Sequence, residues 1–500
     1  MNLSFLTVFL ARSSEAVRVA YAMVMLVPLY LATYFWKSPM FTLPESYANV
    51  SVCTVGDARL DLQTSLAAGQ TLGFFLGKLP AMLLMASPVF FRYRYAAMVV
   101  IMFLAAAFNG VGIALFDRSG ALASPLMQAI AAGCASAIFS SAVFGGIVTW
   151  LEGRRATELL FATLNLAVVL AGGIGRGYGV ALLGWGVAPR WMPLVASSSG
   201  FCLAAFFLAL LAQLPAQTAG DTAQRGERGA MSHAQRAKFC ARFAPGIAVS
   251  LAAYLVIMSL RGFRDFYALE LYTDALGGAP PSSLLLFLAD APGGILSCVM
   301  LALLSTVKRN KSALVCMSVI MLLGVLTMLL ATVLYRFQLI GGIAWLVTIG
   351  AGIYVAYLPM GSPFYDRLMA ASGGRGTVTF MVFAADGVGY LGTLALLAWK
   401  TFATTRSSTA AQRDGSGARA SRSGGPSALF STVSLYACAA LLVLLVLQVI
   451  YFATTLGDAV SSEVEEGAEE ELLSTDDMIC ASGPSQGQAD GAAAYAELHP

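Results

Sequence analysis

Apolar stretches of about twenty residues recur along the whole chain, separated by polar segments that are mostly short. A helix of that length crosses the roughly 30 Å hydrocarbon layer of a bilayer, so each stretch predicts one transmembrane helix. The pattern therefore predicts an all-α, polytopic membrane protein with twelve spans. They lie at about residues 19–41, 64–88, 95–116, 124–150, 156–183, 191–214, 243–265, 281–305, 312–335, 338–360, 377–400 and 429–453.

The longest polar break between the sixth and seventh spans divides the twelve spans into six and six. Two nearly equal halves are typical of a duplicated transporter. We therefore predict two six-helix bundles, at residues 1–214 and 243–455. A cytoplasmic linker at 215–242 would join them, and an acidic, disordered cytoplasmic tail would occupy 456–500.

Composition excludes several classes of protein. Of the 500 residues, 58% are hydrophobic and 11% are charged, against a usual charged share of roughly 25%. So few charges cannot cover a soluble surface, which excludes disorder, a disulfide scaffold and a nucleic-acid binder. The eight cysteines are scattered without metal-like spacing, and neither histidine lies in an apolar span. We expect the lipid bilayer as partner, no nucleic acid and no cofactor.

The formal net charge of +3 hides an asymmetry. From Gly457 onward there are 11 acidic residues and no Lys or Arg, which leaves a basic membrane body. Lys and Arg favour cytoplasmic loops, and their distribution predicts both termini in the cytoplasm of an unspecified membrane. The basic loop at 401–426 departs from this rule. The tail is a candidate site for a cytoplasmic partner, and Asn49 would be glycosylated only in a eukaryote.

Ionisable residues inside spans are costly, at about 2.5–3.5 kcal/mol for each charge at a helix centre. They persist where they face a bundle interior, a cavity or one another. Counting residues from the span ends places Lys78 level with Asp386, and Arg176 level with Asp290. We predict that the first pair forms an inner gate and the second an outer gate between the halves. The alternative is that each charge snorkels or bonds locally.

Further candidates for solute binding or gating lie elsewhere in the spans. Lys37 ends the first span, Arg261 and Arg264 end the seventh, and Tyr354 lies in the tenth. The excess of cations over carboxylates favours an anionic solute. Glycines surround Arg176 and follow Asp386, and two readings stay open for them: a hinge or close helix packing.

Twelve spans with a basic central linker resemble the major facilitator superfamily. The strings WLEGRRATELL, WGVAPRWMPLV, LRGFRDFYALELY and AYLPMGSPFYDRLMAASGGRGTVTFMVFAADGVGYLG are similar to one branch of unknown function within it, over roughly residues 20–455. YLATYFWKSPMF also resembles the first span of organophosphate:phosphate antiporters, which implies that Lys37 contacts an anion. The usual loop signature after the second span is incomplete, since MASPVFFRYRY keeps only its basic end.

The expected function is secondary active transport of a small, anionic solute by alternating access. Asp290 and Asp386 are also candidates for a coupling proton, because a buried carboxylate titrates nearer neutral pH when no cation pairs with it. Pairing with a cation opposes that role, and we favour pairing. Two other classes remain: a non-transporting receptor or sensor on the same fold, and a membrane-embedded transferase, for which no catalytic constellation is evident.

Overall fold

The structure is a computed structural model of the 500-residue chain. It describes residues 4–42, 51–55, 58–85, 87–114, 123–151, 154, 157–215, 233–304, 306–307, 309–371, 379–413 and 426–480. The chain divides into two compact units, Met1–Ala453 and Thr454–Pro500. All the packing considered below lies within the first unit. Asn49, most of the predicted linker and residues 481–500 fall outside the described residues.

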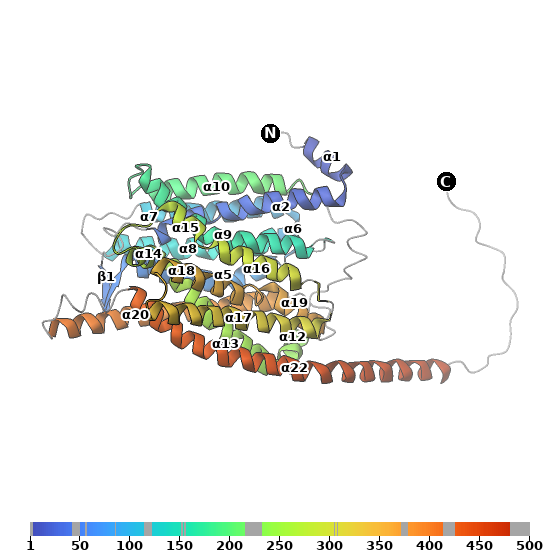
Figure 1. The fold of residues 1–500 in the computed structure, drawn as a ribbon. Coiled ribbons are helices and arrows are strands. Elements are labelled where there is room, and N and C mark those ends of the chain that lie inside the picture. Colours follow the sequence, from blue (N-terminus) through green and yellow to red (C-terminus); the bar gives the residue numbers. More distant parts are fainter. Residues whose placement is uncertain are drawn as a thin grey trace. The chain divides into compact units, whose positions relative to one another are not determined.

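Long apolar helices account for the first six predicted spans. Inside the first unit α10 packs beside α2, and α5 beside α8 (Figure 1). The elements are α1 (Ser4–Arg12), α2 (Glu15–Ala32), the 3-10 helix η1 (Phe35–Lys37), α3 (Ser38–Phe41), α5 (Leu62–Met85), α6 (Pro88–Arg92), α7 (Arg94–Ala114), α8 (Ala123–Val148), α9 (Thr157–Gly184) and α10 (Met192–Leu211).

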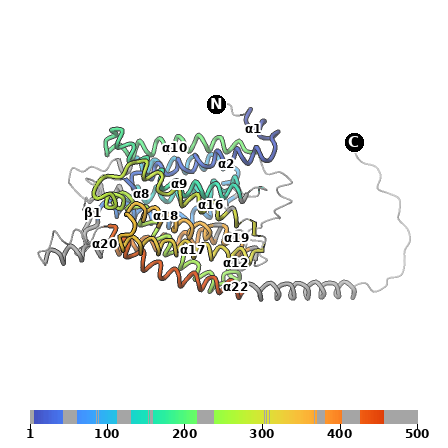
Figure 2. The backbone as a smooth tube through the Cα atoms, viewed as in Figure 1, coloured from blue at the N-terminus to red at the C-terminus, as the bar shows by residue number. Residues whose placement is uncertain are grey.

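The other six predicted spans also fall on helices, and Figure 2 traces the path of the backbone through them. The elements are α12 (His233–Arg242), α13 (Ala244–Phe266), α14 (Ala268–Ala275), α15 (Ser283–Leu288), α16 (Ala291–Leu304), α17 (Asn310–Arg336), α18 (Gly342–Tyr357), α19 (Ser362–Ala371), α20 (Thr379–Arg413) and α22 (Pro426–Cys480).

The helices confirm a multi-pass membrane protein. Within the described ranges, ten stretches are long and apolar enough to cross a bilayer. Two predicted spans fall outside that set. The apolar helix α18 has only 16 residues, and α5 has 24 residues but carries Gln, Thr, Ser and Lys side chains. Among the described residues, ten of the twelve expected spans therefore reach the length and hydropathy of a membrane span.

Two spans that the sequence predicts as continuous are broken. The first changes from α2 through η1 to α3, and the eighth is interrupted at Ala289 and Asp290 between α15 and α16. Pro39 and Pro292 lie in the first turn of the helix after each break, and neither has an N–H that could continue the hydrogen bonds of the preceding helix. Each break carries a buried charge, Lys37 in one and Asp290 in the other.

Outside the spans the structure differs from expectation in two places. The first loop contains an antiparallel hairpin, β1 (Ser51–Val55) with β2 (Ala58–Asp61), which the sequence reading did not predict. The predicted disordered tail begins at residue 456, but α22 continues as helix to Cys480. Residues 456–480 are rich in Glu, Ala and Leu, which have high helix propensity.

Helices from the two halves of the sequence pack directly on each other. The helix α5 packs on α20, and α9 packs on α15 and α16. We call this contact between helices of residues 1–214 and 243–455 the seam. Because the two halves meet there, charged side chains on α5, α9 and α20 and at the break between α15 and α16 are placed to pair across it.

Candidate functional site: charged side chains at the seam

The first ion pair across the seam joins α5 to α20. Lys78 Nζ lies 2.7 Å from Asp386 Oδ2. The hydroxyl of Tyr254, on α13, donates to the other oxygen, Asp386 Oδ1, at 2.6 Å. The side chains of Lys78 and Asp386 keep 11% and 19% of their surface exposed. The pairing that the sequence predicts is confirmed, and we call Lys78 and Asp386 the lysine pair.

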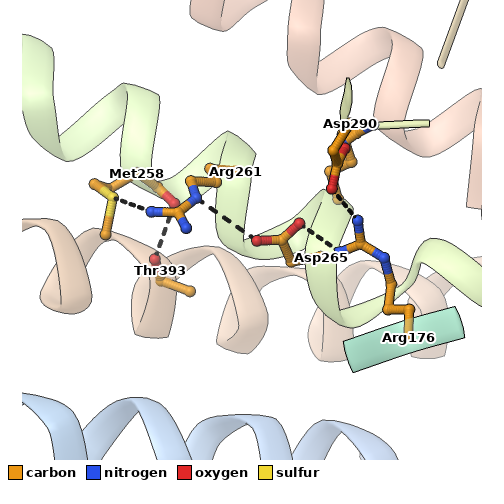
Figure 3. A network of polar contacts seen from close by, with 7 residues as sticks. Arg176, Met258, Arg261, Asp265, Asp290 and Thr393 are labelled. Carbon is orange, nitrogen blue, oxygen red and sulfur yellow. Dashed lines mark hydrogen bonds and ion pairs between the residues drawn. The ribbon is translucent and has the colours of Figure 1, made fainter. Parts of the chain in front are cut away.

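A larger group of charges lies where α9, α13 and the break before α16 meet (Figure 3). We call Arg176, Arg261, Arg264, Asp265 and Asp290 the ion cluster. Arg176 donates through Nη2 to Asp290 Oδ2, which confirms the second predicted pair, and through Nη1 to Asp265 Oδ1 at 2.8 Å. Arg264 Nη1 donates to Asp290 Oδ1 at 2.7 Å. Arg261 Nε lies 3.7 Å from Asp265 Oδ2.

Asp290 is held from both halves of the chain at once. Arg176 comes from α9 and Arg264 from α13, and each binds a different carboxylate oxygen. The side chain of Asp290 has no exposed surface, and those of Arg176 and Arg264 retain 1% and 3%. Charge-assisted bonds to a guanidinium are strong and directional, so this double contact fixes the seam in one register.

The two ion sites lie at different levels of the helix bundle. Tyr254, which contacts Asp386, precedes Asp265 of the ion cluster by eleven residues on α13. At 1.5 Å of rise per residue, that separation is about 16 Å along the helix. The ion cluster lies nearer the end of the bundle where Gln63 Nε2 donates to the carbonyl of Phe266. The seam is thus bonded at two levels, as the sequence predicted.

Glycines allow the helices of the ion cluster to approach. A Cβ on Gly173 would lie 2.9 Å from the carbonyl oxygens of Leu286 and Phe287, and one on Gly177 would lie 2.8 Å from that of Ser283. Neither contact is sterically acceptable, because the atoms belong to the backbone of the facing chain. At these two positions the close-packing reading of the glycines is therefore supported.

Lys37 stands apart from both sites, because it has no carboxylate partner among the described residues. Its Nζ lies 4.0 Å from the ring centroid of Tyr34 and 4.8 Å from that of Phe74. Cation–π contact attracts an ammonium group but leaves its charge uncompensated. Lys37 keeps only 9% of its surface exposed. A buried cation without an anion is costly, which points to an anionic partner that the chain does not supply.

Lys37 also lines a small cavity in the first half of the chain. It has room for about one water molecule, far less than a typical small-molecule pocket. Trp36 Nε1 donates to Ser140 Oγ at 3.2 Å in its wall. The cavity therefore combines a cation with polar and aromatic groups in a small space. Its lining is Tyr30, Thr33, Trp36, Lys37, Ser140, Val143 and Phe144.

Arg261 is the least compensated arginine of the ion cluster. Its only described carboxylate contact is the 3.7 Å pair with Asp265, which Arg176 holds more closely. The guanidinium lies 4.6 Å from the ring centroid of Tyr357 and 5.8 Å from that of Tyr354. Arg261 and Lys37 belong to opposite halves of the chain, and their positive charges repel each other. These two cations are the positions where a bound anion would gain most.

The eight sequence candidates lie in three places: the lysine pair, the ion cluster with Tyr354 beside it, and Lys37. Five cations face three carboxylates there, an excess of two positive charges among the described residues of the two sites and Lys37. Tyr354 is buried beside Arg261, and its hydroxyl has no hydrogen-bond partner among the described residues. The candidates are Lys37, Lys78, Arg176, Arg261, Arg264, Asp290, Asp386 and Tyr354.

Sequence reasoning missed two partners in this region. Asp265 bonds Arg176, and Tyr254 bonds Asp386. The signal for Asp265 was present in the run Arg261-Gly-Phe-Arg264-Asp265, because positions i, i+3 and i+4 share one helix face. No group of three or more His, Cys, Asp or Glu side chains in the described ranges is arranged to hold a metal ion.

Residues 47–416 match the model of the family of unknown function DUF5690. The chain belongs to this family. The match covers most of the chain, including every charged residue of the ion cluster and the lysine pair. No curated protein matches the DUF5690 chain.

Solved structures show which fold this DUF5690 protein adopts. It is similar to a bacterial homologue of the human lysosomal transporter Spinster, with a TM-score of 0.52, 12% identity and coverage of 89% of this chain and 98% of that one. The xylose transporter XylE from E. coli matches with a TM-score of 0.52 and 12% identity, over 84% of this chain and 98% of that one. A variant of the nucleoside transporter NupG matches with a TM-score of 0.53 and 12% identity, over 85% of this chain and 98% of that one. The fold is that of the major facilitator superfamily, as the sequence predicted.

Proposed function

We propose that this DUF5690 protein is a secondary active transporter that carries a small anionic solute by alternating access. The observation that carries the proposal is the excess of positive charge, above all that of Lys37, which is buried with no carboxylate partner among the described residues. An anion would compensate that charge. The structures that share the fold are named as a xylose transporter, a nucleoside transporter and a bacterial homologue of a lysosomal transporter, which supports transport as the activity.

The solute site would lie between Lys37 and Arg261, which belong to opposite halves of the sequence. The ring of Tyr34 contacts Lys37. An anion bound there would contact both halves. We propose that residues 1–214 and 243–455 act as two six-helix bundles around this site.

The ion cluster and the lysine pair would then act as the two gates. With the amino terminus in the cytoplasm, as the basic loops favour, the ion cluster closes the outer side and the lysine pair closes the inner side. Opening either side requires its ion pairs to separate. The glycine contacts of α9 with α15 support a close fit in the outer-closed form.

Thermal unfolding of the purified protein with four probes tests the proposal. Succinate or glucose 6-phosphate should raise the melting temperature, whereas glucose and uridine should leave it unchanged. The Lys37→Met protein should lose the response to the anions. Stabilisation by glucose or uridine alone would reject an anionic solute. Anion binding without flux into proteoliposomes would instead favour a receptor on the same fold.

A further inference from the structure

Aromatic side chains of two kinds lie around the proposed solute site. Some are fully buried and pack the interior, as Tyr254 does. Four others are only half-buried, although they contact charged or aromatic groups there. A ring that keeps accessible surface can contact a further molecule, which a fully buried ring cannot. We call these four the half-buried aromatics: Tyr34 and Phe74 from the first half of the chain, and Tyr357 and Tyr390 from the second.

Three of the half-buried aromatics contact the two least compensated cations. Lys37 Nζ lies 4.0 Å from the ring centroid of Tyr34 and 4.8 Å from that of Phe74. The guanidinium of Arg261 lies 4.6 Å from the ring centroid of Tyr357. An anion held between these two cations would therefore meet aromatic rings from both halves of the chain.

The fourth half-buried aromatic, Tyr390, stacks on Phe74 across the seam. Their ring centroids lie 5.3 Å apart, and their planes differ by 13°. Phe74 is on α5 and Tyr390 on α20, so a movement that opens the seam would separate the two rings and expose a face of each. A flat aromatic ring can enter between two such faces and stack on both.

The distances limit how the charge and the ring of a solute are joined. Lys37 Nζ is only 4.8 Å from the Phe74 centroid, so a carboxylate attached directly to a ring can reach Lys37 while that ring lies on Phe74. The cavity beside Lys37 has room for about one water molecule, so the ring must lie at the seam instead. A sugar phosphate would place hydroxyl groups against Phe74, which offers no hydrogen bond, and an unpaired buried hydroxyl is costly.

We propose that the solute is a planar aromatic carboxylate. Its carboxylate binds between Lys37 and Arg261, and its ring lies between Phe74 and Tyr390. Stacking on aromatic faces adds to the gain from burying apolar surface, so a flat ring is preferred over a saturated ring of the same charge. The inference rests on the proposed function, because it needs an anion at Lys37.

Two carboxylates separate the effect of stacking from that of charge and size. Benzoate and cyclohexanecarboxylate are both ionised at neutral pH and have the same carbon count, but only benzoate is flat and aromatic. Titration calorimetry of the purified protein should give benzoate a dissociation constant about two- to tenfold lower. Benzyl alcohol, which is aromatic but uncharged, should not bind measurably. Equal affinity for the two carboxylates, or binding of benzyl alcohol as tight as that of benzoate, would overturn the proposal.

Variants of the stacked pair test where the ring lies. Phe74→Leu and Tyr390→Leu should abolish the preference for benzoate but keep the response to succinate, which needs only the cations. Tyr390→Phe keeps the ring and should keep the preference. Phe108→Leu is the matched control, because Phe108 and Phe139 stack within the first half of the chain, with ring centroids 5.8 Å apart. A preference that persists in both leucine variants of the seam pair would overturn the proposal.

The same titrations distinguish this inference from the proposed function. Binding of succinate or glucose 6-phosphate with no preference for benzoate would overturn the aromatic solute and leave anion transport standing. Failure of succinate, glucose 6-phosphate and benzoate all to bind and to cross into proteoliposomes would overturn both.

Discussion

The ion cluster and the lysine pair both join the two halves of the chain, but they hold their carboxylates in different ways. In the ion cluster, Asp290 receives two arginines and has no exposed surface. In the lysine pair, Asp386 receives one lysine and one tyrosine hydroxyl and keeps 19% of its side-chain surface. Two planar guanidinium groups are hard to displace from Asp290, whereas the single flexible ammonium of Lys78 can leave Asp386. The comparison suggests a firm closure at one level of the seam and an exchangeable contact at the other.

The largest effect is expected from Asp290→Ala. This change leaves Arg176 and Arg264 buried without that carboxylate, and removing one partner of a buried ion pair costs about 3–5 kcal/mol. The melting temperature of the purified protein should fall steeply. Asp386→Ala is the matched change in the lysine pair and should cost less, since Lys78 can reorient. Equal losses in the two variants would contradict the contrast between the two sites.

A smaller effect is expected from Gly177→Val. The new side chain would press α9 away from α15, because even its Cβ would lie 2.8 Å from the carbonyl oxygen of Ser283. Overpacking of this kind costs about 1–3 kcal/mol, measured as a fall in melting temperature. Gly184→Val is the control at the end of the same helix, where a Cβ would meet no atom within 4 Å. If both variants unfolded alike, helix propensity rather than seam packing would explain the loss.

A double-mutant cycle measures the lysine pair itself. Lys78→Met and Asp386→Asn should each lower the transport rate, and the double variant should lose less than the sum of the two. Coupling energies between contacting residues are about 0.5–3 kcal/mol. The same cycle on Lys78 and Asp265, which are not in contact, should be additive. Additivity at Lys78 and Asp386 would remove the inner gate from the account.

The smallest effect on stability is expected from Lys37→Met. Without solute the lysine is a buried cation with only aromatic contacts, so its replacement should leave the melting temperature unchanged or raise it. The effect on binding should be large, with the anion response lost. A steep fall in stability without any solute would show that Lys37 has a structural role instead.

The two ion pairs could be predicted from the sequence because a charged side chain is costly inside a membrane. Lys78, Arg176, Asp290 and Asp386 interrupt apolar runs, and their distances from the span ends were enough to pair them by depth. Depth does not specify direction around a helix axis, so the second arginine on Asp290 and the role of Asp265 were not foreseen. The breaks at the first and eighth spans were missed because hydropathy continues through them, although the prolines were visible.

Distances between spin labels test the central claim, that the ion cluster holds one end of the seam closed while the other can open. One pair of labels would replace the exposed Trp185 and Leu339, and a second pair would replace Tyr93 and Thr306 toward the opposite end. Both pairs would be placed in a background with the native cysteines replaced. In Arg176→Met the first distance should lengthen while the second shortens. Two distances that stay fixed, or that change in the same direction, would contradict the account.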